Sequence, residues 1–196
     1  MKTYSTTDII KIMQKIELNL FTLSDFAKLF NLDNQQTLYK KIARLEQKQI
    51  IKKLIKGRYQ FLLTQTNNFR IANFLYSSSY ISLESALSFH SVITGFSHQL
   101  TSITTKPTKM IMLDQQEYKY SHISPYLYWG YEKKENFLLA DPAKALLDYL
   151  YLGTKGLRNL NLDEMDFGKI DLKQLELYAK KFHNQSLSAI VKKITL

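Results

Sequence analysis

Helical spacing of apolar residues dominates the first part of the chain. Two segments, "STTDIIKIMQKI" and "FTLSDFAKLFNL", repeat apolar positions at the three- and four-residue intervals of an amphipathic helix. Ser and Thr side chains begin the first segment and Thr22 begins the second, so each segment starts with a residue type that caps helices. Asp25 follows in the first turn, where the helix dipole favours a carboxylate. We therefore predict two short helices.

A third segment, "QQTLYKKIARLEQKQ", predicts a helix with two different faces. At about 100° per residue, Leu38, Ile42 and Leu45 form an apolar stripe that must pack inward. The opposite face gathers side chains that can bond to base edges and phosphates: Gln36, Lys40, Arg44 and Gln47, flanked by Thr37, Lys41 and Lys48. Glu46 is the only acid of the segment and lies off this face. We predict that this face binds DNA.

The next segment, "IIKKLIKGRYQFLL", predicts a basic β-hairpin, because two β-prone runs flank Lys56 and Gly57 and glycine permits the positive φ of a tight turn. The hairpin cations are Lys52, Lys53, Lys56 and Arg58, and Leu54, Tyr59 and Phe61 can pack beneath them. Three helices followed by a basic hairpin is the order of a winged helix-turn-helix domain. We assign this domain to residues 1–65, with the third helix in the major groove and the hairpin on the backbone.

Positive charge is concentrated in the same region. Residues 1–65 hold 12 Lys and Arg against 5 Asp and Glu, a net of +7, whereas residues 66–196 hold 15 against 12, a net of +3. This distribution indicates a polyanionic partner for the first region. A lysine-rich surface that only maintains solubility is the alternative. Because one small module rarely supplies both affinity and specificity, we expect binding as a pair on inverted or repeated half-sites.

The remaining residues, 66–196, predict a mixed α+β domain that begins with a short helix, "NFRIANFLY". Residues 101–140 contain β-branched and aromatic runs ("TSITTK", "KMIMLD", "YKYSHI", "YLYWGY", "NFLLA"). The expected turns between these runs lie at Lys106-Pro107, Asp114-Gln115, Ser124-Pro125 and "EKKEN". The runs predict a small antiparallel sheet.

Three C-terminal helices follow the predicted sheet. Asp141 caps the first and Pro142 opens it. Asp171 and Gln174 form a capping-box pattern at the start of "DLKQLELYAKKF", and "SLSAIVKKITL" is the last helix. The predicted fold class is α+β, with an N-terminal winged helix-turn-helix domain and a second domain that combines the sheet with C-terminal helices.

The segment "YSSSYISLESALSFH", residues 76–90, combines serines, a carboxylate and an imidazole. If Ser82 caps a helix, Leu83, Ala86, Leu87 and His90 share its apolar face, whereas Glu84, Ser85 and Ser88 share the other. Ser88 and His90 then project about 160° apart and form no nucleophile–base pair. We predict a core role for His90 and an exposed partner-contact face made of Glu84, Ser85 and Ser88. A hydrolase that uses Ser85 or Ser88 is the alternative.

Other catalytic and metal-binding classes find no support in the sequence. There is no cysteine, and His90, His98, His122 and His183 lack metal-ligand spacing. The acids of "DEMD", residues 163–166, lack the Gly-Ser motif that accompanies the metal site of a nucleotidyltransferase. No phosphate-binding glycine loop occurs in the sequence. We therefore expect no catalytic residue, metal or cofactor. Since no apolar run approaches the ~20 residues of a membrane span and the N-terminus lacks a secretory signal, we expect a cytoplasmic protein.

Two segments, "IANFLYSSSYISLESAL" and "ADPAKALLDYLYL", resemble the AbiEi-type antitoxins of type IV toxin–antitoxin and abortive-infection systems. In that family a winged helix-turn-helix precedes a Ser-Tyr-Ile-Ser-Leu-Glu-x-Ala-Leu segment, an aromatic β-region and an Ala-x-Pro-x-Lys-Ala-Leu-Leu-Asp helix. The matching ranges here are 79–87 and 140–148. The chain departs from the pattern at Ser78, where relatives often have Pro, and at Ala143, where they often have Glu.

The resemblance implies a repressor that binds double-stranded operator DNA of its own operon. It also implies an antitoxin that opposes a nucleotidyltransferase-like toxin without necessarily forming a stable complex. Composition and spacing support only the DNA-binding half of this interpretation. The alternative is a stand-alone winged-helix transcriptional regulator whose second domain senses a ligand or an unrelated partner.

Overall fold

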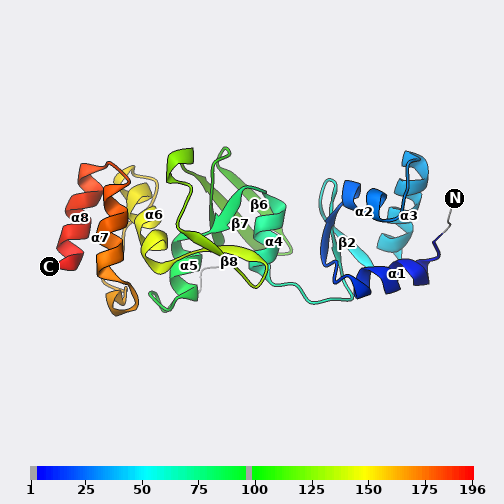
Figure 1. Ribbon diagram of the computed structural model, residues 1–196, viewed down its shortest axis with the longest axis horizontal. Coiled ribbons are helices and arrows are strands. Elements are labelled where there is room, and N and C mark those ends of the chain that lie inside the picture. Colours follow the sequence, from blue (N-terminus) through cyan, green and yellow to red (C-terminus); the bar gives the residue numbers. More distant parts are fainter. Residues whose placement is uncertain (1–3, 96–98) are drawn as a thin grey trace. The chain divides into compact units, whose positions relative to one another are not determined.

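The computed structural model describes residues 4–95 and 99–196. It divides the chain into two compact units, the first ending at Asn67 and the second beginning at Asn68 (Figure 1). This division lies two residues beyond the domain boundary expected after residue 65. Helices and strands occur in both units, so the predicted α+β class is confirmed.

The first unit packs three helices against a three-stranded antiparallel sheet with the order β1-β3-β2. Its elements are α1 (Thr6–Lys15), β1 (Leu20–Thr22), α2 (Leu23–Leu29), α3 (Gln35–Gln47), β2 (Ile51–Ile55) and β3 (Arg58–Phe61). Met13, Phe21, Phe26 and Phe61 are completely buried in the core between them. The predicted order of helices and hairpin is present, whereas β1 was not expected because three residues are too few to show alternation. The winged helix-turn-helix assignment itself stays a prediction.

Capping side chains fix where the first helices begin. The Thr22 hydroxyl accepts the Asp25 amide at 3.1 Å, and the Asp25 carboxylate accepts the Thr22 amide at 2.9 Å, which forms the capping box of α2. Ser5 and Asp8 form the equivalent box on α1. Gly57 adopts φ +75° in the turn between β2 and β3, as the hairpin prediction requires. The sequence predicts these helix starts because each capping side chain satisfies backbone hydrogen-bonding groups within a few residues of itself.

The second unit contains a six-stranded sheet with the order β6-β7-β5-β4-β9-β8 (Figure 1). Its strands are β4 (Ser79–Ile81), β5 (Gln99–Thr104), β6 (Lys109–Leu113), β7 (Gln116–His122), β8 (Tyr131–Lys134) and β9 (Phe137–Ala140). The prediction of an antiparallel sheet is wrong, because β5 pairs parallel with β7 and β4 pairs parallel with β9. Alternating polarity reports which face a residue occupies and carries no information on the direction of the neighbouring strand.

The segment between β7 and β9 also differs from its prediction. Pro125 opens a single 3₁₀ turn, η1 (Pro125–Leu127), where "YLYWGY" predicted a strand. β8 instead starts at Tyr131 and uses most of the "EKKEN" segment that was expected to be a turn. The turn is Glu135-Asn136, both residues with positive φ. Charged residues form a strand here because β8 is an edge strand whose side chains are largely exposed.

Helices surround this sheet and complete the second unit (Figure 1). They are α4 (Asn68–Leu75), α5 (Leu83–Phe89), α6 (Pro142–Thr154), η2 (Phe167–Lys169), α7 (Leu172–Lys180) and α8 (Gln185–Thr195). The predicted cap of α6 is confirmed, since the Asp141 carboxylate accepts the Lys144 amide at 2.8 Å. Ten consecutive residues of α6, 143–152, are buried, which makes it the central helix.

The predicted capping box of α7 is only half formed. Asp171 accepts the amides of Lys173 and Gln174, as expected. The Gln174 side chain donates instead to the Tyr178 hydroxyl at 2.9 Å, so it does not return to the cap. Across residues 4–95 and 99–196, none of the helices has the combined length and apolarity that crossing a bilayer requires.

Candidate nucleic-acid interface and motif cluster

The outer face of α3 presents the predicted contact residues to solvent. Leu38, Ile42 and Leu45 are buried in the core, which orients the helix. Asn34 caps its start by accepting the Thr37 amide at 3.0 Å. Six predicted positions are exposed: Gln36, Thr37, Lys40, Arg44, Gln47 and Lys48. These positions therefore carry three cations, two amides and a hydroxyl, the groups that recognise phosphates and base edges.

Lys41 has a different environment from the rest of the predicted set. Its side chain is half-buried, and its ammonium group donates to the Tyr4 carbonyl at 2.8 Å. This bond ties α3 to the residues that precede α1. In this conformation Lys41 supports the position of α3, and the exposed face is left to the other predicted residues.

The hairpin brings a second group of cations to the first unit. Lys53 and Lys56 are exposed, whereas Lys52 and Arg58 are half-buried. Leu54, Tyr59 and Phe61 are buried beneath the hairpin, as predicted. The pairing register between β2 and β3 shifts between Lys53 and Ile55. Its exposed cations are of the type that contact the sugar-phosphate backbone without reading sequence.

Tyr39 is a surface residue of α3 that the sequence prediction omitted. It is 55 % exposed, although it adjoins the buried Leu38. On the helix it projects about 60° from Gln36, beside the predicted contact face. Its ring can contact a thymine methyl group and its hydroxyl can bond to a phosphate or base edge. The prediction selected charged, amide and threonine residues and therefore omitted Tyr39, which helical projection alone places beside the contact face.

The two segments that resemble the antitoxin family meet in one buried network. Tyr80 and Ser82 come from the first segment, and their hydroxyls both donate to Asp148 at 2.8 Å. Lys144, which lies on α6 with Asp148, pairs with that carboxylate and donates to the Tyr80 hydroxyl at 3.0 Å. All four side chains are fully buried. The network joins β4 and the start of α5 to α6.

Burial and pairing act against each other in this network. Burial raises the pKa of Asp148 and of Tyr80, and it lowers the pKa of Lys144, while the attraction between Lys144 and Asp148 opposes both of their shifts. Because no side chain of the network is exposed, a substrate cannot reach it. Its chemistry is therefore structural, and it holds a charge pair inside the core.

Aromatic rings lie around the Lys144 ammonium group. The Trp129 and Phe182 rings both lie 5.1 Å from Nζ, a distance suited to cation–π attraction. Gly130 has φ +74°, and a Cβ at this position would lie 2.7 Å from Cγ of Lys144. Glycine is required here so that the backbone can approach the lysine stem.

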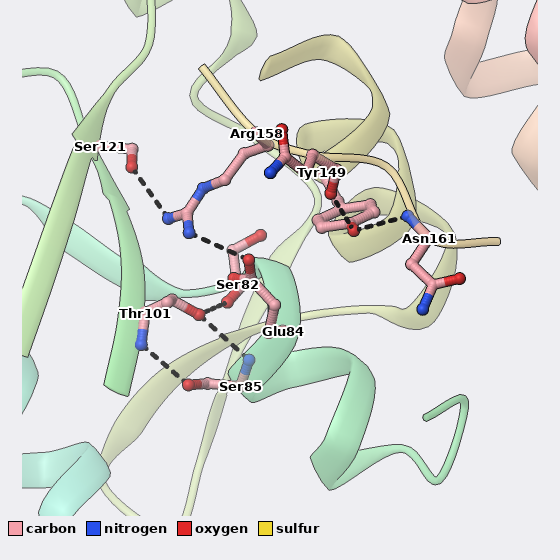
Figure 2. Close-up of polar contacts among 9 residues, drawn as sticks. Ser82, Glu84, Ser85, Thr101, Ser121, Tyr149, Arg158 and Asn161 are labelled. Atoms are coloured by element: carbon pink, nitrogen blue, oxygen red, sulfur yellow. Dashed lines mark hydrogen bonds and ion pairs between the residues drawn. The ribbon is translucent and has the colours of Figure 1, made fainter. Parts of the chain in front are cut away.

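A second network fastens the start of α5 to β5, as Figure 2 shows. The Thr101 hydroxyl accepts the Ser85 amide at 3.0 Å and donates to the Ser82 carbonyl at 2.8 Å. The Ser85 hydroxyl accepts the Thr101 amide at 2.8 Å. These bonds hold Leu83 at φ +58°, a conformation that leucine rarely adopts and that costs about 1–3 kcal/mol.

The predicted partner-contact face of α5 is only partly available. Ser85 is buried, so the prediction of its exposure is wrong: β5 packs directly against this position and Thr101 satisfies its polar atoms. Glu84 is half-exposed and pairs with Arg158 at 2.9 Å, and Arg158 also bonds to the Ser121 hydroxyl (Figure 2). Ser88 is also half-exposed, and it lines a pocket together with Ser85.

His90 follows the last residue of α5 and is half-buried. Its Nε2 lies 2.9 Å from the Ala140 carbonyl, so the imidazole has a hydrogen-bond partner, whereas its partial exposure places it at the margin of the core and not inside it as predicted. In the described part of the chain, no three His, Asp or Glu side chains gather where they could hold a metal ion. His98 lies outside the described residues.

Comparison with known proteins adds no relative: no family model matches the sequence, and no curated protein matches it.

Proposed function

We propose that this protein is a cytoplasmic DNA-binding regulator that acts as the antitoxin of a type IV toxin–antitoxin system. It binds double-stranded operator DNA, represses its own operon and counteracts a nucleotidyltransferase-like toxin. The observation that carries the DNA-binding part is the exposed face of α3, where Gln36, Lys40 and Arg44 stand clear of the core.

The chemistry of this surface divides into two roles. Arg44 carries the paired N–H donors that read guanine, and Gln36 carries the amide donor and acceptor that read adenine, in the major groove. Lys40 on α3 and the exposed hairpin lysines, Lys53 and Lys56, neutralise phosphates and position the helix. Tyr39 extends the reading face on one side. In this proposal α3 reads the bases, and the hairpin anchors the protein to the phosphates.

The antitoxin part of the proposal rests on the resemblance at residues 79–87 and 140–148. The contacts among Tyr80, Ser82, Lys144 and Asp148 support it, because they give the matching residues of both segments one shared structural task. Residues with this buried structural role stabilise the fold of the second unit. We therefore assign the opposition to the toxin to the second unit.

Operator binding can be tested with the double substitution Lys40→Ala and Arg44→Ala. We expect loss of the gel-shift complex formed by the wild-type protein on DNA from the promoter of its operon. The double substitution Lys133→Ala and Lys134→Ala, at two exposed positions of β8, removes the same charge and should retain the complex. Equal binding by the α3 variant and the control would remove α3 as the reading helix.

Toxin neutralisation can be tested by co-expression with a nucleotidyltransferase-like gene from the same locus, placed under a separate promoter. We expect the full chain to restore growth. The Lys40→Ala, Arg44→Ala variant separates the two activities, because rescue by that variant shows that neutralisation does not require DNA binding. If the full chain fails to restore growth, the antitoxin assignment is wrong while the DNA-binding assignment stands on its own assay.

A second candidate function is a stand-alone regulator whose second unit senses a small ligand. The observation that favours it is a half-open pocket of about 350 Å³ bordered by Phe69, Ser88 and Phe89. This volume is within the range of small-molecule sites. The gene neighbourhood decides between the two: an adjacent nucleotidyltransferase-like gene favours the antitoxin, and its absence favours the sensor.

A further inference from the structure

The two edges of the six-stranded sheet have opposite chemical character. β8 exposes Glu132, Lys133 and Lys134 at one edge. β6, at the other edge, exposes Met110 and Met112, which are 63 % and 64 % accessible. Charged side chains, lysine above all, prevent an edge strand from pairing with another chain. β8 carries three charged residues in a row, whereas β6 carries one, the exposed Lys109 at its first position, and is uncharged from Met110 to Leu113.

The β6–β7 hairpin determines which backbone groups of β6 are free to pair. Its turn is the two-residue Asp114-Gln115, both with positive φ, and Leu113 lies opposite Gln116. In such a hairpin the pair next to the turn is hydrogen-bonded and the pairs then alternate. The amide and carbonyl groups of Met110 and Met112 therefore point away from β7. Among the described residues, β6 pairs with β7 alone.

We propose that β6 pairs antiparallel with β6 of a second copy of this chain, around a two-fold axis that passes through Ile111. This register places Met110 opposite Met112 of the second copy, and Met112 opposite its Met110. Both are hydrogen-bonded positions, so each free amide and carbonyl of these residues is used. The two sheets become one continuous sheet, and the exposed methionines pack against each other.

Charge on β7 favours this register weakly over its neighbours, because the two β7 strands lie about 14 Å apart, beyond the Debye length at physiological salt. Residues opposite each other in a sheet share a face, so the axis can pass only through a residue. On β7, Lys119 lies beside Met110 and Glu117 lies beside Met112. An axis at Met110 would align the Lys119 side chains of both copies, and an axis at Met112 would align both Glu117 side chains. With the axis at Ile111, each line of four opposed residues across the joined sheet has Lys119 of one copy at one end and Glu117 of the other copy at the other end.

The register can be read by disulfide cross-linking, because the chain contains no cysteine. The single variants are Met110→Cys and Met112→Cys, both at exposed positions. Opposed residues at a hydrogen-bonded position have Cα atoms about 5.5 Å apart, within the range of a disulfide, whereas diagonal residues are about 7–8 Å apart. We expect a covalent dimer when the two variants are mixed and oxidised, and little when either is oxidised alone.

The control for random collision is Glu132→Cys on the β8 edge, oxidised under the same conditions. A dimer that forms equally from the control, or mainly from one β6 variant alone, overturns the proposed pairing. Sedimentation of the full-length chain supplies the second measurement, over about 1 µM to 1 mM because a one-strand interface is small and weak. We expect a concentration-dependent dimer whose dissociation constant rises at least about tenfold in the Met110→Lys, Met112→Lys variant.

A wild-type chain that remains monomeric over this range also overturns the proposal. Circular dichroism establishes that the variants are folded, and substitution at two largely exposed positions is compatible with the fold. No DNA or toxin enters either measurement. The pairing of β6 can therefore fail while the proposed regulator function holds, and the reverse is equally possible.

Discussion

At the residue scale, the second unit depends on one buried carboxylate. Asp148 accepts the Tyr80 and Ser82 hydroxyls and balances the charge of Lys144. The Asp148→Asn substitution keeps the shape and leaves the Lys144 ammonium without a counter-charge in the core. We expect the free energy of unfolding to fall by about 3–5 kcal/mol, measured by urea denaturation.

The matched control is Glu84→Gln, which breaks the partly exposed pair with Arg158 by the same chemical change. The pair is largely buried, with side-chain exposures of 10 % for Arg158 and 24 % for Glu84, so we expect a loss above the about 0–1 kcal/mol of a surface pair and below that of Asp148→Asn. Equal losses for Asp148→Asn and Glu84→Gln would show that burial of the Asp148 charge does not govern stability.

Thr101 is a second residue whose removal has a specific expected cost. The Thr101→Val substitution keeps the volume but removes the hydroxyl that bonds to the Ser85 amide and the Ser82 carbonyl. Because both groups are buried, we expect a loss of about 1–3 kcal/mol in the free energy of unfolding. Leu83 should also become more mobile, which amide hydrogen exchange at the start of α5 would detect. Unchanged exchange would mean that packing alone holds Leu83.

Acid dependence of the first unit follows from the cap of α2. The Thr22 amide and hydroxyl both donate to Asp25 and hold the pKa of its carboxyl below the usual 3.8. A depressed carboxyl pKa contributes stability above pH 3.8 that is lost as the pH falls through the lower, folded value. In an NMR titration, Thr22→Ala should raise the pKa of Asp25 and Ser5→Ala should not. No change in Thr22→Ala would exclude the Thr22 hydroxyl as a cause of the lowered pKa and leave the backbone amide as the remaining cause.

At the element scale, the structure shows which elements the sequence could predict. The helix starts at Thr22 and Asp141 were predictable because their caps are satisfied within three residues. The pairing of β5 with β7 was not, because the direction of a neighbouring strand depends on the path of the chain between them. β8 was missed because an edge strand tolerates charge, which removes the hydrophobic signal.

The proposed DNA-binding role of α3 and the hairpin predicts a specific response to salt. If α3 and the hairpin neutralise about 5 phosphates, log affinity should fall with log salt at a slope near −4 to −5. Lys53→Ala with Lys56→Ala should reduce the slope by about 2 and weaken binding to all sequences equally. Gel-shift titrations at several salt concentrations measure both effects. A slope that does not change in this variant would remove the hairpin from the interface.

At the scale of the whole molecule, the candidate interface was largely predictable and the motif cluster was not. Exposure of Lys40 and Arg44 follows from the helical period of α3 alone. The bonds from Tyr80 and Ser82 to Asp148 span 68 and 66 residues, which a projection of one helix cannot reveal. For the same reason Ser85 was placed at the surface: its partner, Thr101, lies on a strand 16 residues later.

The large sequence separation between the residues of the Asp148 network determines the order in which the two units can fold during synthesis on the ribosome. Every element of the first unit is complete by Phe61, so this unit can fold while the rest of the chain is still being translated. β4 and α5 must wait for α6, because the partners of Tyr80 and Ser82 emerge more than 60 residues after them. The proposed DNA-binding surface is therefore assembled first, and the second unit acquires its buried ion pair only when translation has passed Asp148.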